Sequence, residues 1–111
     1  IWCSDNTDAI NRTRIQYGTS FFYPVSAVGA HVSAVPNHQT GRVTNLNTRG
    51  VTAMAGTFGY ELNPALLSEE EKQTIREQIQ TYKKYERLIN EGTYWRLSRR
   101  ILQRFISDYV V

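Results

Sequence analysis

Two short runs of small and apolar residues restrict the fold of this chain more than any other feature. The first lies within "SFFYPVSAVGAHVSAVP" and has a continuous apolar centre at residues 27–32, and the second is "VTAMAGTFGYEL". Continuous apolar runs of this kind are typical of strands that are buried on both faces in a parallel sheet. In the second run, Gly56 and Gly59 indicate positions that another side chain or backbone approaches closely. Because two such strands cannot cover their own faces, we expect them to belong to a larger α/β sheet or barrel.

Helix-forming segments separate these strands. Residues 1–3 are interpreted as the end of an earlier strand. A short helix is predicted over residues 8–17, with Ser4, Asp5 or Thr7 available as its N-terminal cap. Because the sequence opens with Ile rather than Met, in what reads as a strand, we expect it to be a piece of a longer polypeptide.

The strongest local signal lies later in the chain. Ser68 and the three glutamates that follow it form a capping box, apolar residues recur at helical spacing, and Gly92 marks a stop, so a helix is predicted over 68–91. The polar segment 37–50 is predicted to be a loop with room for one helical turn. The order strand, helix, strand, loop, strand, helix predicts the α/β fold class with parallel strands.

The formal charge of +3 does not indicate a basic binding face. Residues 1–95 carry nine basic and nine acidic side chains, and the excess comes from residues 96–111. A neutral body argues against a nucleic-acid partner. No apolar run approaches the roughly 20 residues that span a membrane, so no membrane partner is expected. Cys3 is the single cysteine and has no partner for an internal disulfide, which favours a reducing, cytoplasmic location.

Asp5 and Asp8 are the main candidates for chemistry. They directly follow the first strand end, and active-site groups gather at the C-terminal ends of strands in α/β barrels. One interpretation is that both acids stabilise the N-terminus of the following helix. The other is that one of them donates and recovers a proton, as paired carboxylic acids do in sugar hydrolysis. The residue pattern alone leaves both interpretations open.

The remaining candidates are weaker. His31 and His38 match no zinc spacing, and are interpreted as a hydrogen-bonded strand-end histidine and a loop residue. Cys3 has no evident base beside it, and "GTFG" lacks the lysine of a phosphate-binding loop. No metal or cofactor is therefore predicted. A set of aromatic side chains could stack on a sugar ring, although core packing is commoner. Its members are Phe21, Phe22, Tyr23, Phe58 and Tyr60.

Four blocks of the sequence together resemble the bacterial α-galactosidases of glycoside hydrolase family 36. They are "WCSDNTDAINRTRIQYGTS", "YPVSAVGAHVSAVPNHQTGRV", "TRGVTAMAGTFGYELN" and "LSEEEKQTIREQIQTYKKYERLINEGTYWRL". The resemblance covers residues 1 to about 97 in the family's order, which makes it far more specific than a single motif.

The resemblance implies both a fold and an activity. Members of this family combine a β-sandwich, a catalytic (β/α)8 TIM barrel and a C-terminal β-domain. They release terminal α-linked galactose from melibiose- and raffinose-type sugars with retention of configuration. Residues 1–97 are then expected to be the last part of an incomplete barrel, from the end of its sixth strand through its eighth helix. Residues 98–111 do not resemble the family's continuation, and are interpreted as a divergent basic tail or as a truncated or frameshifted reading.

The resemblance also assigns roles and partners. The first Asp of the family's "W-[TC]-S-D-[DN]-T-D" block is the general acid/base, which falls on Asp5, whereas Asp8 becomes a neighbouring structural acid. The nucleophilic Asp lies upstream in the family and is absent here, so this chain alone is not expected to hydrolyse sugars. The expected partner is an α-galactoside oligosaccharide, and the full-length bacterial enzyme is expected to be a homo-oligomer. The alternatives are an α-N-acetylgalactosaminidase-like relative and a non-catalytic interaction module.

Overall fold

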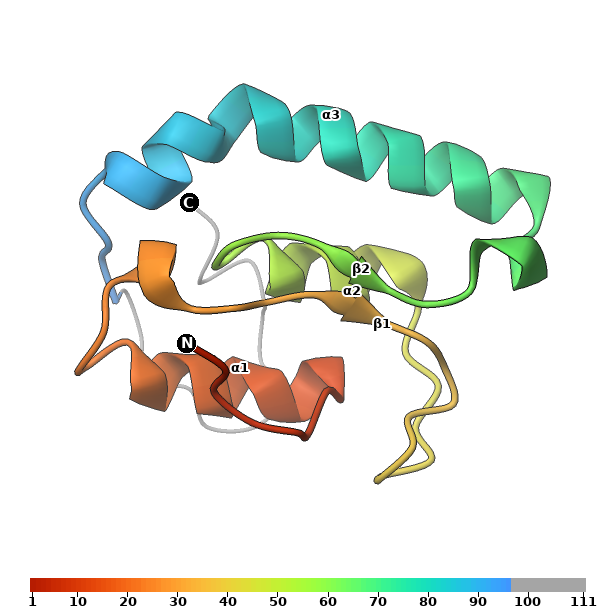
Figure 1. Ribbon diagram of the computed structural model, residues 1–111, viewed down its shortest axis with the longest axis horizontal. Helices are drawn as coiled ribbons and strands as arrows, with labels where there is room; N and C mark the ends of the chain where they lie inside the picture. The colour runs from red at the N-terminus through yellow and green to blue at the C-terminus, as the bar shows by residue number, and fades with distance from the viewer. Residues whose placement is uncertain (97–111) are drawn as a thin grey trace.

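Short parallel strands flanked by helices form the centre of the computed structural model, which describes residues 1–96 (Figure 1). The helices and strands follow in the order α1 (Ala9–Thr19), β1 (Val32–Ser33), α2 (Leu46–Ala53), β2 (Tyr60–Glu61) and α3 (Glu69–Glu91). Two 3-10 turns, at Val25–Ala27 and Pro64–Leu66, precede β1 and α3. The α/β class expected from the sequence is therefore present in the described residues.

The strands are parallel neighbours. Val32 of β1 lies opposite Tyr60 of β2 in a parallel register. Further parallel bridges join Trp2 to Gly29 and Gly29 to Thr57. The strand end predicted at the N-terminus is thus confirmed, and it lies beside the extended segment that leads into β1. All three extended segments run in the same direction, so their C-terminal ends meet at one edge.

One face of the strands is fully buried among the described residues. Val28, Ala30 and Val32 are at most 3 % exposed and alternate along the segment that ends in β1. This face lies against the helices, since α2 packs on β1 and also contacts both α1 and α3. The intervening residues, Gly29 and His31, belong to the opposite face, where the His31 side chain is 9 % exposed. Within residues 1–96, the first strand is therefore fully buried on one face and partly covered on the other.

The helix α3 confirms the strongest local prediction. Ser68 accepts a hydrogen bond from the Glu71 amide, and the Glu71 side chain accepts one from the Ser68 amide. The helix ends at Gly92, whose amide donates to the Leu88 carbonyl. Its buried side chains, Gln78 and Tyr82, face the strands, and the Tyr82 hydroxyl donates to the Gly56 carbonyl over 2.9 Å.

The helix α2 corrects the prediction for the middle of the chain. Residues 46–50 were expected in a loop with room for one helical turn and residues 51–53 in a strand, but all of them form this helix. Asn45 caps it by accepting a hydrogen bond from the Thr48 amide. Inside the domain, the Gln16 side chain of α1 donates to the Thr52 carbonyl over 3.0 Å. Packing against α1 therefore overrides the strand propensity of the small apolar residues.

The two glycines before β2 differ. A Cβ atom at Gly56 would lie 2.7 Å from the Val28 carbonyl oxygen and 2.9 Å from the Ala30 Cβ, so the predicted close approach is confirmed there. A Cβ atom at Gly59 would meet nothing within 4 Å among the described residues, so the same prediction is wrong at that position. The difference arises because Gly56 lies against the buried side of the neighbouring strand.

The predicted basic tail, residues 98–111, lies outside the described residues. Within residues 1–96, no helix is both long enough and apolar enough to cross a membrane.

Candidate active site

The C-terminal edge of the parallel strands brings together side chains from three parts of the chain. Asp5 follows the first extended segment, His31 lies near the end of the second, and Glu61 ends β2. Their convergence follows from the parallel register, since equivalent ends of neighbouring strands lie at the same edge. This edge is the candidate site.

Asp5 is exposed and has a defined contact. Its Oδ1 accepts a hydrogen bond from the Trp2 indole Nε1 over 3.0 Å. Because an indole N–H is only a donor, Oδ1 must act as the acceptor in this bond. This bond fixes the orientation of the carboxyl group, and lone pairs remain on both of its oxygens. A carboxyl group arranged in this way can act as a general acid and general base.

A buried arginine of α1 holds the loop that carries Asp5. The Arg12 side chain donates from Nη2 to the Ser4 carbonyl over 2.6 Å and from Nε to the Asn6 carbonyl over 2.7 Å. Its Nη1 also lies 3.0 Å from the Cys3 sulfur. Cys3 therefore belongs to the set of contacts that Arg12 makes with this loop.

Arg12 is a residue that the sequence interpretation missed. The feature of the sequence that could have identified Arg12 is its helical spacing from other residues of α1. The buried residues of this helix are Ala9, Arg12, Thr13 and Gln16. These positions form one helical face. An arginine on the buried face of a helix needs several acceptors, because burying an unpaired charge is costly.

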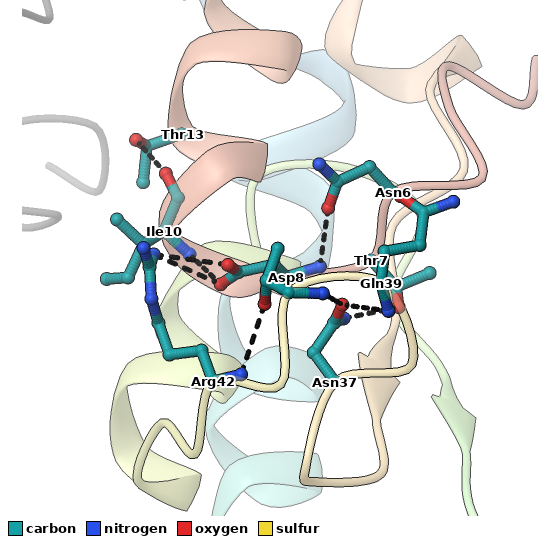
Figure 2. Close-up of polar contacts among 9 residues, drawn as sticks. Asn6, Thr7, Asp8, Ile10, Thr13, Asn37, Gln39 and Arg42 are labelled. Carbon is teal, nitrogen blue, oxygen red and sulfur yellow. Dashed lines mark hydrogen bonds and ion pairs between the residues drawn. The ribbon is translucent and has the colours of Figure 1, made fainter.

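Asp8 is the N-terminal cap of α1, a position for which the sequence offered several candidates. Its side chain accepts a hydrogen bond from the Ile10 amide over 3.1 Å and so caps α1, whereas Ser4, Asp5 and Thr7 do not. Figure 2 shows its carboxylate facing the Arg42 guanidinium, with Nη1 of Arg42 3.1 Å from Oδ2. The Asp8 side chain is fully buried.

The loop after β1 is attached to the start of α1 by a second contact. The Asn37 side chain donates to the Thr7 hydroxyl over 3.1 Å, and its Oδ1 accepts from the Gln39 amide (Figure 2). Together with the pair of Arg42 and Asp8, this contact anchors the loop beside the candidate site. Residues 6–8 are therefore held from two sides of the fold.

His31 occupies the middle of the candidate site. Its ring stacks on Trp2 with centroids 4.8 Å apart and an angle of 16° between the planes. Its Nε2 lies 2.8 Å from Oε2 of Glu61, which makes an ion pair only when the histidine is protonated. Burial lowers the pKa of His31, nearby Glu61 opposes this shift, and Arg12 adds to it. The neutral ring is therefore favoured near neutral pH.

The other candidates lie away from this edge or face the core. His38 is exposed in the loop after β1, as predicted. Phe58 stacks on Tyr82 of α3, and the Tyr60 hydroxyl donates to Gln78, so both rings pack toward the helices. Burial raises the pKa of Tyr60 to about 12. Among residues 1–96, no group of three or more His, Cys, Asp or Glu side chains is arranged to hold a metal ion.

The remaining aromatic residues of the predicted set are exposed. Phe21, Phe22 and Tyr23 follow α1 and are 56 %, 84 % and 48 % exposed. The Arg96 guanidinium lies 4.2 Å from the centroid of the Phe21 ring. These residues come before the extended segment that ends in β1, so they lie toward the N-terminal edge of the sheet. Asp5 lies at the C-terminal edge, and the three aromatic residues therefore do not join the candidate site.

The fold and the site together define a general class of protein. Parallel α/β sheets and barrels carry their active-site groups at the C-terminal ends of the strands, and this chain presents an exposed carboxyl group there. The family model described as Melibiase matches residues 1–92, and the chain belongs to this family.

Similar proteins agree with this assignment. The chain is 92 % identical over 98 residues to the bifunctional alpha-galactosidase/sucrose kinase AgaSK of Mediterraneibacter gnavus, covering 88 % of the chain and 10 % of that protein. It is 60 % identical over 96 residues to the alpha-galactosidase AgaA of Geobacillus stearothermophilus, covering 86 % of the chain and 13 % of AgaA. The chain thus spans only about a tenth of the length of these relatives.

Solved structures show the same local fold. The galactosidase domain of AgaSK superposes with a TM-score of 0.85 over 86 % of this chain and 13 % of that structure, at 92 % identity. A GH36 AgaA variant bound to raffinose gives a TM-score of 0.84 at 59 % identity, with the same coverage of both chains. Another AgaA variant bound to stachyose also gives 0.84, at 60 % identity and the same coverage. The arrangement of helices and strands in this chain is therefore that of a segment of these enzymes.

Proposed function

We propose that residues 1–97 form the last part of the catalytic (β/α)8 barrel of a retaining α-galactosidase, from the end of its sixth strand through its eighth helix. The order of the parallel strands and the helices that follow them supports this position. The family match and the structural similarity to α-galactosidases support the activity. The observation that carries the proposal is the place of Asp5, which follows a parallel strand and lies exposed at its C-terminal edge.

Asp5 is proposed to be the general acid/base of the reaction. In the first step a nucleophilic carboxylate, supplied by another part of the enzyme, attacks the anomeric carbon while Asp5 protonates the departing glycosidic oxygen. In the second step Asp5 removes a proton from water, which attacks the anomeric carbon and releases the nucleophile. Asp5 thus ends the cycle protonated, as it began.

The substrate class follows from the relatives. Structures of AgaA variants contain raffinose and stachyose, which are oligosaccharides. We propose that the enzyme containing this chain likewise acts on terminal α-linked galactose of melibiose- and raffinose-type sugars. Its cytoplasmic location and its assembly as a homo-oligomer remain predictions from the sequence.

A chimeric enzyme tests the role of Asp5. In AgaSK, the segment that matches this chain is replaced by residues 1–96, and sucrose kinase activity then reports intact protein independently of galactosidase activity. We expect the parent chimera to hydrolyse raffinose and the Asp5→Asn variant to lose about 10²–10⁴-fold in turnover, the usual contribution of acid/base catalysis. The matched control is Glu70→Gln, because the Glu70 side chain is exposed on α3 and makes no hydrogen bond or ion pair within residues 1–96.

Azide identifies the chemical role. Azide attacks the glycosyl-enzyme without needing a base, so it should restore turnover of the Asp5→Asn variant on an activated aryl galactoside. The carbon–nitrogen bond forms as the bond to the nucleophile breaks, and two inversions yield the α-galactosyl azide. Near-parent hydrolysis of raffinose by Asp5→Asn, or an inactive variant that azide does not rescue, would disprove the assignment.

A further inference from the structure

We propose that Arg12 is a positioning residue that fixes the backbone on both sides of Asp5 and so aims its carboxyl group during catalysis. This inference rests on the proposed function of Asp5. The two acceptors of Arg12 at 2.6 and 2.7 Å are the carbonyls of Ser4 and Asn6, the residues immediately before and after Asp5. A planar guanidinium holds two acceptors in a fixed relative geometry.

The location of Arg12 makes this contact rigid. The residue is 4 % exposed and projects from α1, whose N-terminus is itself fixed by Asp8. Its Nη1 also lies 3.4 Å from the Gly29 carbonyl, on the neighbouring extended segment. The loop with Asp5 is therefore fixed relative to the adjacent strand as well as to the helix.

The acceptors of Arg12 distinguish it from an ordinary ion pair. Within residues 1–96, no carboxylate lies at ion-pair distance from its guanidinium, which instead contacts backbone carbonyls and the Cys3 sulfur. A buried charge is expensive and needs this full set of acceptors. The arrangement therefore places a rigid fork beneath the one loop that carries the candidate acid.

Arg12 also acts on the side chain of Asp5. Its guanidinium lies 5.6 Å from the centroid of the Trp2 ring, and the Trp2 indole donates to Oδ1 of Asp5 over 3.0 Å. Because the indole is only a donor, it holds Oδ1 as an acceptor and so fixes the direction in which the carboxyl group points. Arg12 thus supports both the backbone of Asp5 and the ring that orients its carboxyl group.

A second buried arginine provides a matched control. Arg49 of α2 donates to the Ser33 carbonyl over 2.7 Å and to the Thr44 carbonyl over 3.0 Å, at the end of the next strand. It holds a loop in the same manner as Arg12, but no candidate acid lies between its acceptors. Arg49→Lys should therefore affect stability without changing how the enzyme handles different leaving groups.

The test compares two substrates in the AgaSK chimera. Raffinose needs a proton on its leaving oxygen, whereas p-nitrophenyl α-galactoside releases a stable anion and needs little help from an acid. We expect Arg12→Lys, which keeps the charge but loses the fork, to lower kcat/KM for raffinose at least tenfold. For the aryl galactoside we expect less than a threefold change. Arg49→Lys should leave the ratio of the two kcat/KM values at the parent level.

Several outcomes would overturn the positioning role. If Arg12→Lys lowers kcat/KM equally for both substrates, the ratio of the two values stays at the parent level. Arg12 is then only structural and does not position Asp5. If Arg12→Lys does not accumulate as folded enzyme, Trp2→Phe removes the indole N–H while retaining a ring beneath the guanidinium. It must show the same selective loss on raffinose, and otherwise the proposal fails.

The two proposals fail in different ways. If Asp5→Asn lacks either the selective loss on raffinose or the azide rescue, the proposed function is wrong. If Asp5→Asn shows both and the Arg12→Lys ratio equals that of the parent, only the positioning role is wrong.

Discussion

Replacing Asp8 should destabilise the enzyme that contains this chain without removing its catalytic acid. The Asp8 side chain is fully buried, caps α1 through the Ile10 amide at 3.1 Å, and pairs with Arg42 at 3.1 Å. Asp8 lies three residues after Asp5, so the two acids share a loop but are predicted to have separate roles.

The expected loss can be worked from these contacts. Asp8→Ala removes a helix cap, a loss of about 1 kcal/mol, and a charged contact, a further loss of about 2 kcal/mol. Asp8→Asn keeps the oxygen that accepts from Ile10 and should lose only the second contribution. The Arg42 side chain is 39 % exposed and can be hydrated when its partner is removed, so the loss stays below that of a fully buried pair.

The assay is the rate of thermal inactivation of galactosidase activity in the AgaSK chimera, because large enzymes often unfold irreversibly. A loss of about 3 kcal/mol corresponds to at most roughly 150-fold faster inactivation for Asp8→Ala, and about 2 kcal/mol to roughly 30-fold for Asp8→Asn. Turnover of raffinose before heating should stay within about threefold of the parent for Asp8→Asn, in contrast to the loss of about 10²–10⁴-fold expected for Asp5→Asn.

Two results would refute this reasoning. If Asp8→Asn inactivates no faster than the surface control Glu70→Gln, the pair with Arg42 contributes nothing. If Asp8→Asn and Asp8→Ala inactivate equally fast, the cap contributes nothing. A double-mutant cycle with Arg42→Met then measures the pair directly, since its loss should largely vanish when Asp8 is already replaced.

Two further predictions concern packing and pH. Gly56→Ala should lose about 1–3 kcal/mol of stability, because its Cβ would lie 2.7 Å from a carbonyl oxygen of the adjacent strand. Gly59→Ala should be nearly neutral, because its Cβ would meet nothing within 4 Å among the described residues. The melting temperatures of the two variant chimeras compare these effects, and equal values would contradict the close approach at Gly56. Burial lowers the pKa of His31 below its usual 6.5, with Glu61 opposing and Arg12 adding to the shift, so the folded protein binds fewer protons than the unfolded chain. The contribution of neutral His31 to the free energy of unfolding should be complete above pH 6.5 and be lost as the pH falls below that value. The His31→Gln variant should therefore show a flatter curve of melting temperature against pH in this range. A curve identical to that of the parent would exclude the effect.

The accuracy of the sequence predictions depended on how local each signal was. The helix α3 was predicted closely because Ser68, Glu71 and Gly92 act within one turn of its ends. The helix α2 was missed because residues 46–50 have the polar composition of a loop and residues 51–53 have the small, apolar composition of a strand. Its stability depends on distant partners, such as the Gln16 side chain that donates to the Thr52 carbonyl.

The candidate site shows the same division. The position of Asp5 after a strand could be inferred from the sequence, and the resemblance to a family supplied its role. The contacts of Arg12 with Ser4 and Asn6 could not be inferred, because they require α1 to fold back beneath the loop that precedes it. The stacking of Trp2 on His31 likewise depends on the parallel register of two segments that are far apart in the chain.

The sequence by itself determined the parallel α/β class, the order of the strands with α1 and α3, the capping of α3 and the family of the chain, because short patterns of residue type carry this information. Only the tertiary structure decided which acid caps α1. Asp5 and Asp8 have the same side chain, but Asp8 lies buried between the Ile10 amide and Arg42, from a loop 34 residues later in the sequence, while Asp5 remains exposed beside Trp2. The difference between the two acids is one of surroundings, and the folded chain creates those surroundings.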